Sequence, residues 1–187
     1  MRKAVNVAIL STMLFGTLLT AAPPTLAEEI SCTGTIGART VDNVRVPQGR
    51  SCTLEGTTVL GTVYVSRDAT LRSRGAQING NVQAENHRLV VVTNGTEVGG
   101  AIQIGQGGVY RVSGSSADKI EVKANSGASF LRNNQVDGDI QVFNHSGGVD
   151  IANNQVDGNL QCKENVPAPT GGGNVVQGNK EDQCASL

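Results

Sequence analysis

Aromatic side chains are scarce in this chain of 187 residues, which has three Phe, two Tyr and no Trp. A core built around bulky rings is therefore excluded, and so is a sugar-binding groove lined with tryptophan. An excess of one charge is also missing, because 15 Lys and Arg stand against 16 Asp and Glu, and this balance argues against nucleic acid as a partner. Any core must be aliphatic and regular.

Sequence motifs of common catalytic centres are absent as well. There is no Gly-x-Ser-x-Gly elbow, no His-Glu-x-x-His helix and no phosphate loop. The two histidines, His87 and His145, are separated by three turns of a repeat that is described below. This distance of roughly 14 Å is too long for them to act together. We therefore expect a protein that is not an enzyme.

Long hydrophobic runs are missing except near the N-terminus, where Met1-Arg2-Lys3 precedes an apolar stretch that breaks at two prolines. Together with the small-residue end Thr25-Leu26-Ala27, this order is typical of a secretory signal peptide cleaved after Ala27. The run is slightly short for a retained membrane span. We predict a signal peptide at 1–27 and a secreted, periplasmic or cell-surface domain at 28–187, with no integral membrane segment after cleavage.

Internal repetition is what the sequence has in abundance. The segment Asn133-Asn134-Gln135-Val136-Asp137-Gly138 recurs without change 20 residues later, at 153–158. An aliphatic residue equivalent to Val136, called the anchor here, recurs at intervals of 18 to 20 residues and defines eight turns. The anchors are Val41, Val59, Ile78, Val98, Ala117, Val136, Val156 and Val176.

Glycine or asparagine recurs two residues after the anchor and three residues before it, and both residue types tolerate positive φ. We expect sharp corners at both columns, and a less strictly specified bend eight residues after the anchor. The first column supplies the predicted corners Gly61, Gly80, Gly100, Gly138 and Gly158.

Aliphatic and polar residues alternate between the corners, as in Val82-Gln83-Ala84 and Ile102-Gln103-Ile104. Period two is typical of strands with one buried face. The sequence therefore predicts an all-β fold, a single-stranded parallel β-solenoid (β-helix) of about eight three-cornered coils of roughly 19 residues. The first and fifth turns are one residue short after the anchor, so we expect a local irregularity in each.

Four cysteines in an exported chain indicate disulfides rather than a zinc site. Cys32 and Cys52 fall on neighbouring coils at one end, and Cys162 and Cys184 do so at the other. The strand spacing suits the Cα separation of a disulfide. We expect one disulfide at each end, where coils have a single neighbour and fray first, and a monomer with capped ends.

The mature chain resembles secreted bacterial β-helix proteins. Its ending, Leu160-Gln161-Cys162-Lys163-Glu164-Asn165 followed by Thr170-Gly171-Gly172-Gly173-Asn174 and Lys180-Glu181-Asp182-Gln183-Cys184, is similar to that of uncharacterised exported bacterial proteins, which implies no activity. The short Gly-x-aliphatic-x-aliphatic coils are also similar to those of bactofilins, which are cytoplasmic polymers. Pectate-lyase-like enzymes share the general architecture but build their sites on large loops that this chain lacks.

Two surfaces are candidate sites. Aspartates near one corner would repel one another unless calcium bound between them, although solvated corner residues are the ordinary interpretation and no cofactor is expected. The weak calcium candidates are Asp118, Asp137, Asp139 and Asp157.

Arginines on the outward side of the strand before the anchor, with Val92 and Phe130 on the same face, would form a flat cationic array for an anionic glycan. The ordinary interpretation is a solvated sheet face. The candidate ligand face consists of Arg72, Arg74, Arg111, Phe130 and Arg132.

Amide side chains that recur from coil to coil predict hydrogen-bonded ladders. The candidates are Gln83, Gln103, Gln141 and Gln161, with the pairs Asn133/Asn153 and Asn134/Asn154. The function that we expect is that of an exported, non-enzymatic structural or adhesive rod of the cell envelope or extracellular space, with an envelope or extracellular glycan as its partner. The alternative is a polysaccharide-binding or polysaccharide-processing β-helix protein.

Overall fold

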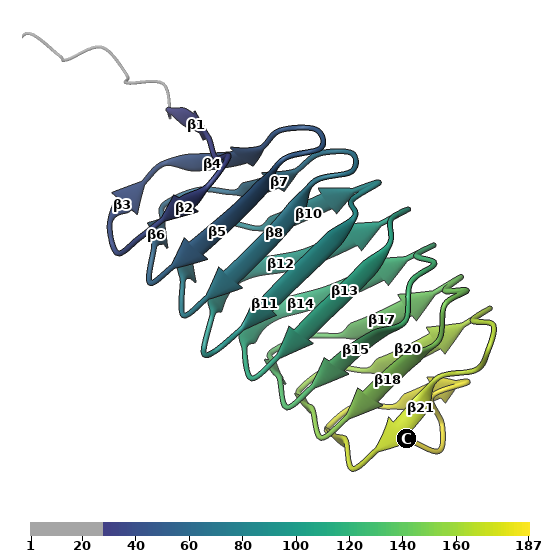
Figure 1. Ribbon diagram of the computed structural model, residues 1–187. Helices are drawn as coiled ribbons and strands as arrows, with labels where there is room; N and C mark the ends of the chain where they lie inside the picture. The colour runs from purple at the N-terminus through teal and green to yellow at the C-terminus, as the bar shows by residue number, and fades with distance from the viewer. Residues whose placement is uncertain (1–27) are drawn as a thin grey trace, which may run out of the picture.

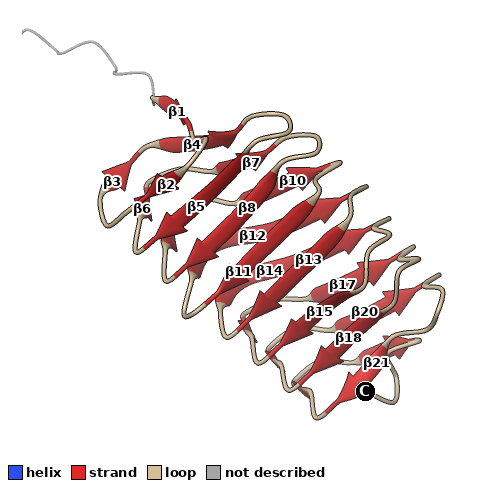
Figure 2. Ribbon diagram, viewed as in Figure 1, coloured by secondary structure: helices blue, strands red, loops and turns tan. Residues whose placement is uncertain are grey.

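The structure is a computed structural model that describes residues 28–187, so the predicted signal peptide lies outside the described residues (Figure 1). This part of the chain consists of short strands and connecting loops without a helix (Figure 2). The strands wind into stacked coils, and every strand pairs in parallel with its equivalent one coil away. The predicted β-solenoid of about eight coils is confirmed.

Each coil presents three faces. The narrow face carries the anchors, and its strands are β3 (Thr40–Val41), β6 (Thr58–Val59), β9 (Gln77–Ile78), the first parts of β12 (Glu97–Gly105) and β14 (Ser116–Lys123), β16 (Gln135–Val136), β19 (Gln155–Val156) and β22 (Val175–Val176). The glutamine face follows the anchors, and its strands are β1 (Glu29–Ser31), β4 (Asn43–Val46), β7 (Val63–Val65), β10 (Val82–Glu85), the last parts of β12 and β14, β17 (Ile140–Phe143), β20 (Leu160–Lys163) and β23 (Lys180–Asp182).

The third face, called the arginine face here, is a separate sheet of eight strands. These are β2 (Thr35–Ile36), β5 (Ser51–Glu55), β8 (Thr70–Arg74), β11 (Leu89–Thr93), β13 (Val109–Ser113), β15 (Ser129–Arg132), β18 (Val149–Ala152) and β21 (Thr170–Gly172). The side chains that point inward from the three faces form one continuous aliphatic core, as the alternation of apolar and polar residues predicts.

The chain turns through left-handed backbone at two of the three corners. Positive φ occurs three residues before the anchor, for example 57° at Gly75 and 55° at Asn133, and near the third bend, as at Asn86 with 53°. The expectation of positive φ at Gly61, Gly80, Gly100, Gly138 and Gly158 is wrong, since none of them has it.

Close approach of neighbouring coils explains this glycine column instead. A Cβ on Gly80 would lie 2.6 Å from the carbonyl oxygen of Gly61, and one on Gly138 would lie 2.9 Å from that of Asp118. A side chain does not fit there, because real Cβ atoms do not approach backbone so closely. Gly100 differs from the others, since β12 runs through this corner as a continuous strand.

Both expected irregularities are present. Val44, Arg45 and Val46 pair with the second coil at an offset of 19 residues, whereas Thr40 and Val41 pair with it at 18. In the fifth coil the register between β12 and β14 shifts between Val98 and Ala101. A residue missing from one corner is thus absorbed locally, and the flanking strands keep their inward faces.

The two ends are closed as predicted by disulfides, Cys32–Cys52 with a Cα separation of 5.4 Å and Cys162–Cys184 with 5.2 Å. Two disulfides indicate an oxidising environment. In the last coil, Lys180 and Asp182 pair in register with the buried residues Leu160 and Cys162, and charges at these positions oppose addition of a further coil. Within 28–187 no helix is long and apolar enough to cross a membrane.

Candidate functional site

The arginine face carries a row of alternating cationic and apolar side chains that runs along the rod. Arg72 on β8 pairs in register with Val91 on β11, which pairs with Arg111 on β13, which pairs with Phe130 on β15. Arg74 and Arg132 lie two residues further along their strands and point to the same side, because side chains alternate along a strand. The predicted ligand face is therefore a set of neighbours on one sheet.

Val92 does not belong to this face. It is fully buried in the core, and Val91 takes the outward position. The run Val90-Val91-Val92 offers no alternation from which the phase can be read, whereas the register with Arg72 and Arg111 fixes it.

Three arginines of this face have no anionic partner within the described chain. The ion pairs of residues 28–187 join Arg45 to Glu29, Lys119 to Glu121 and Arg132 to Asp150. The guanidinium groups of Arg72, Arg74 and Arg111 accordingly remain free to meet an external anion, and Arg111 is well exposed.

Phe130 orders the arginine side chains around it. The guanidinium carbon of Arg132 lies 5.1 Å from the ring centroid, and that of Arg111 lies 5.9 Å away. Arg132 is held further by Asp150, with 2.6 Å between Nε and Oδ1. Stacking on a ring leaves the N–H edge of a guanidinium available to bind a carboxylate.

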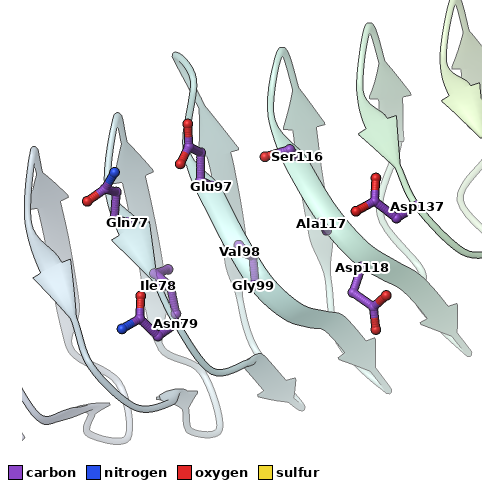
Figure 3. A pocket seen from close by; sticks show the side chains of 10 residues that line it. All are labelled: Gln77, Ile78, Asn79, Glu97, Val98, Gly99, Ser116, Ala117, Asp118 and Asp137. Atoms are coloured by element: carbon purple, nitrogen blue, oxygen red, sulfur yellow. The ribbon is translucent and has the colours of Figure 1, made fainter.

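A polar hollow of about 390 Å³ lies on the narrow face across the third to sixth coils (Figure 3). Glu97, Asp118 and Asp137 contribute carboxylates, and Gln77 and Asn79 contribute amides. Gly99 contributes no side chain to the floor of the hollow. A larger residue does not fit there, because its Cβ would lie 2.8 Å from the carbonyl oxygen of Asn79. The hollow coincides with the irregular fifth coil, where the repeat departs from its usual length.

The four calcium candidates do not gather into one site. Asp118, Asp137 and Asp157 are exposed on the narrow face, whereas Oδ1 of Asp139 accepts a hydrogen bond of 2.7 Å from the backbone N–H of Asn159. In residues 28–187 no group of three or more His, Cys, Asp or Glu side chains is arranged to hold a metal ion.

Asp139 belongs instead to a side-chain ladder that the sequence analysis missed. At this corner Oδ1 of Asn43 accepts from the N–H of Thr62, Oδ1 of Asn81 from that of Ala101, and Oδ1 of Asn159 from that of Asn179. Asn or Asp directly after the glycine column, or within it in the short first coil, is the signal that would have revealed it, because the glycine of the next coil leaves room for this side chain.

The predicted amide ladders are only partly formed. Nε2 of Gln141 donates to Gln161 at 2.7 Å, while Gln83 and Gln103 form no such bond. Asn134 and Asn154 form a buried ladder that continues to Asn174. The prediction for Asn133 and Asn153 is wrong, since both are exposed corner residues at a φ of 55° without side-chain hydrogen bonds to each other.

Both histidines lie in the core. The relative exposure of His87 is 2 % and that of His145 is 1 %. Burial lowers the pKa of His87 to about 4 and also lowers the pKa of His145. The His145 ring meets Tyr110 edge-on with a centroid separation of 5.4 Å. Both imidazoles are therefore neutral groups of the core at pH 7.

Comparison of the chain with protein-family models, with curated proteins and with solved structures finds no match. A proposal about function therefore depends on the arginine face and the polar hollow described above.

Proposed function

We propose that the protein is an exported, non-enzymatic structural or adhesive rod of the cell envelope or extracellular space. The observation that supports this proposal is a regular β-solenoid, closed by a disulfide at each end, that presents long flat faces. Each coil contacts only its neighbours, so such a rod is stiff along its axis and offers the same surface many times. The disulfides fit an oxidising compartment.

The alternative is a polysaccharide-binding or polysaccharide-processing protein, and the free arginines favour the binding form. Processing would need a convergent acid and base at one place. The acidic hollow of the narrow face brings three carboxylates, those of Glu97, Asp118 and Asp137, into one lining.

Expression of the full chain in a secreting bacterial host, followed by fractionation, tests the proposal. We expect a mature product that begins at Glu28, contains no free thiol and is a monomer in light scattering. We also expect it to be retained with envelope or extracellular polymer and to release no oligosaccharide from purified envelope glycans. A reduced product in the cytoplasm would overturn the proposal. Steady release of oligosaccharide that stops in a Glu97→Gln/Asp118→Asn/Asp137→Asn variant would establish the processing alternative.

A further inference from the structure

We propose that the arginine face binds a linear carboxylated polysaccharide whose chain runs along the long axis of the rod. This inference rests on the proposed adhesive function and names its partner. The sheet is continuous over β8, β11, β13 and β15, so a bound chain crosses several coils.

The charge of the face has one sign over the centre of the row. Arg72 and Arg111 lie in it without a carboxylate neighbour in register. Glu55 pairs in register with Arg74 at one side, and Asp150 is already occupied by Arg132 at the other. The strongest attraction for an anion is therefore between β8 and β13.

The spacing of the free charges fits a polymer rather than a single small anion. Arg72 and Arg111 are separated by two strand spacings, roughly 10 Å, which is about the length of a disaccharide unit. Each guanidinium offers two parallel N–H groups to a carboxylate. A chain of uronic acids can thus place carboxylates on alternate sugars against the two arginines.

The apolar members of the row suit the sugar rings between those charges. Val91 separates Arg72 from Arg111, and Phe130 follows Arg111. Both side chains are half-buried and present apolar surface to the C–H faces of pyranose rings. Stacking of Arg111 and Arg132 on Phe130 also restricts these side chains in advance, which lowers the entropy cost of binding.

Other partners fit this face less well. An extended peptide cannot add a strand, because strands pair on both sides of β8, β11 and β13 within the sheet. Single-stranded nucleic acid would need several aromatic side chains on which its bases stack, and Phe130 is the one aromatic side chain of this row.

Binding of the oxidised mature protein to immobilised alginate, a carboxylated polysaccharide, tests the inference. We expect binding that weakens as salt is raised, no binding to neutral dextran, and weaker binding to polyglutamate. The variant Arg72→Gln/Arg74→Gln/Arg111→Gln should bind alginate at least about tenfold more weakly, which corresponds to about 1.4 kcal/mol, because it removes the three guanidinium groups that can pair with carboxylates. Phe130→Ala should weaken binding by a smaller factor.

A matched control removes the same charge elsewhere. Arg39→Gln/Lys123→Gln/Lys163→Gln takes three exposed cations from outside the row, and we expect its alginate affinity to change less than about twofold, within the usual effect of distant surface charges. Equal losses in the two triple variants would overturn the inference, as would absence of alginate binding at low salt or tighter binding to polyglutamate. Such a failure leaves export and envelope retention to be judged by the fractionation experiment, so the two proposals fail separately.

Discussion

Two corners of the solenoid contain buried polar side chains, and they differ in how these side chains are hydrogen-bonded. Before the narrow face, Asn134, Asn154 and Asn174 stack in successive coils and are at most 5 % exposed. After the glutamine face, the equivalent stack contains His87, Gly107, Asn125, His145 and Asn165. We call these the asparagine corner and the histidine corner.

The asparagine corner leaves its polar groups paired. Oδ1 of Asn154 accepts from both the backbone N–H and Nδ2 of Asn134, and Nδ2 of Asn154 donates to Asn174 and to the carbonyl oxygen of Leu131. An amide has both a donor and an acceptor, so it extends a ladder in both directions.

The histidine corner leaves several polar atoms unpaired. Both ring nitrogens of His87, Nδ1 of His145 and the hydroxyl of Tyr110 have no hydrogen-bond partner in the described chain. An unpaired buried polar group costs about 1 to 3 kcal/mol. The comparison teaches that a corner is stabilised by residues that pair along the axis, and that imidazole interrupts this pairing.

The largest effect is expected at the asparagine corner. Asn154→Ala removes four hydrogen bonds and leaves polar groups of Asn134, Leu131 and Asn174 without their partners. We therefore expect the free energy of unfolding to fall by about 4 kcal/mol. Urea denaturation at pH 7 measures it. The neighbouring Asn153→Gly keeps the positive φ and loses no ladder, and should cost less than about 1 kcal/mol. Similar losses in both variants would contradict the ladder's role.

Acid should weaken the histidine corner. The folded protein keeps His87 neutral down to a pKa of about 4, whereas an unfolded histidine takes up its proton near pH 6.5. The unfolded state binds more protons between these values, so stability is lost as the pH falls from about 6.5 to 4, on the order of 3 kcal/mol in total. The lowered pKa of His145 acts in the same direction.

Urea denaturation at intervals across this range measures the loss. His87→Leu should flatten the profile, because leucine takes up no proton. An equally steep profile in His87→Leu would show that other groups cause the acid lability.

A smaller effect is expected where the two stacked residues of the histidine corner touch. A Cβ on Gly107 would collide with the imidazole of His87, so Gly107→Ala should cost about 2 kcal/mol. In a His87→Ala background the same change should cost at least about 1 kcal/mol less, because the obstacle is gone. Gly34→Ala, with no atom near its Cβ, serves as the neutral control in thermal and urea unfolding. Additive losses in the double variant would exclude the contact.

The sequence predicted the fold well because the same pattern of buried, exposed and corner residues recurs in every coil. An alternating pattern such as Val82-Gln83-Ala84 recurs often enough to establish the inward phase, and the cysteines at each end then fall on neighbouring coils. The two coils that lack one residue could also be recognised, since Val41 and Val44, like Ala117 and Ile120, are three residues apart where the other coils have four. These features depend on spacing, which the sequence displays directly.

Contacts between coils were harder to predict. The glycine column at Gly80 was read as backbone conformation, although its cause is the carbonyl of Gly61 one coil away. The phase of Val90-Val91-Val92 and the pairing of Asn134 rather than Asn133 likewise depend on neighbours about 20 residues distant. For the candidate site, the sequence indicated the arginines, while the stacking on Phe130 required the register of β13 and β15.

The smallest predicted effect is a gain, and it asks whether the histidine corner can be converted into an asparagine corner. His145→Asn would place an amide between Asn125 and Asn165, and Oδ1 of Asn165 already accepts from the backbone N–H of residue 145. The new amide can pair with Asn125 in the same way, which should outweigh the loss of the Tyr110 contact and raise the free energy of unfolding by about 1 kcal/mol at pH 7. The gain should increase at pH 5, because proton uptake by His145 favours the unfolded state of the parent protein there and the variant lacks this imidazole.

His87→Asn is the matched control, because Gly107 in the next coil offers no amide to extend, and it should bring no gain at pH 7. If His145→Asn were destabilising while His87→Asn was not, the edge-on contact with Tyr110 and the bond to the Gly148 carbonyl would be the dominant interactions at this corner.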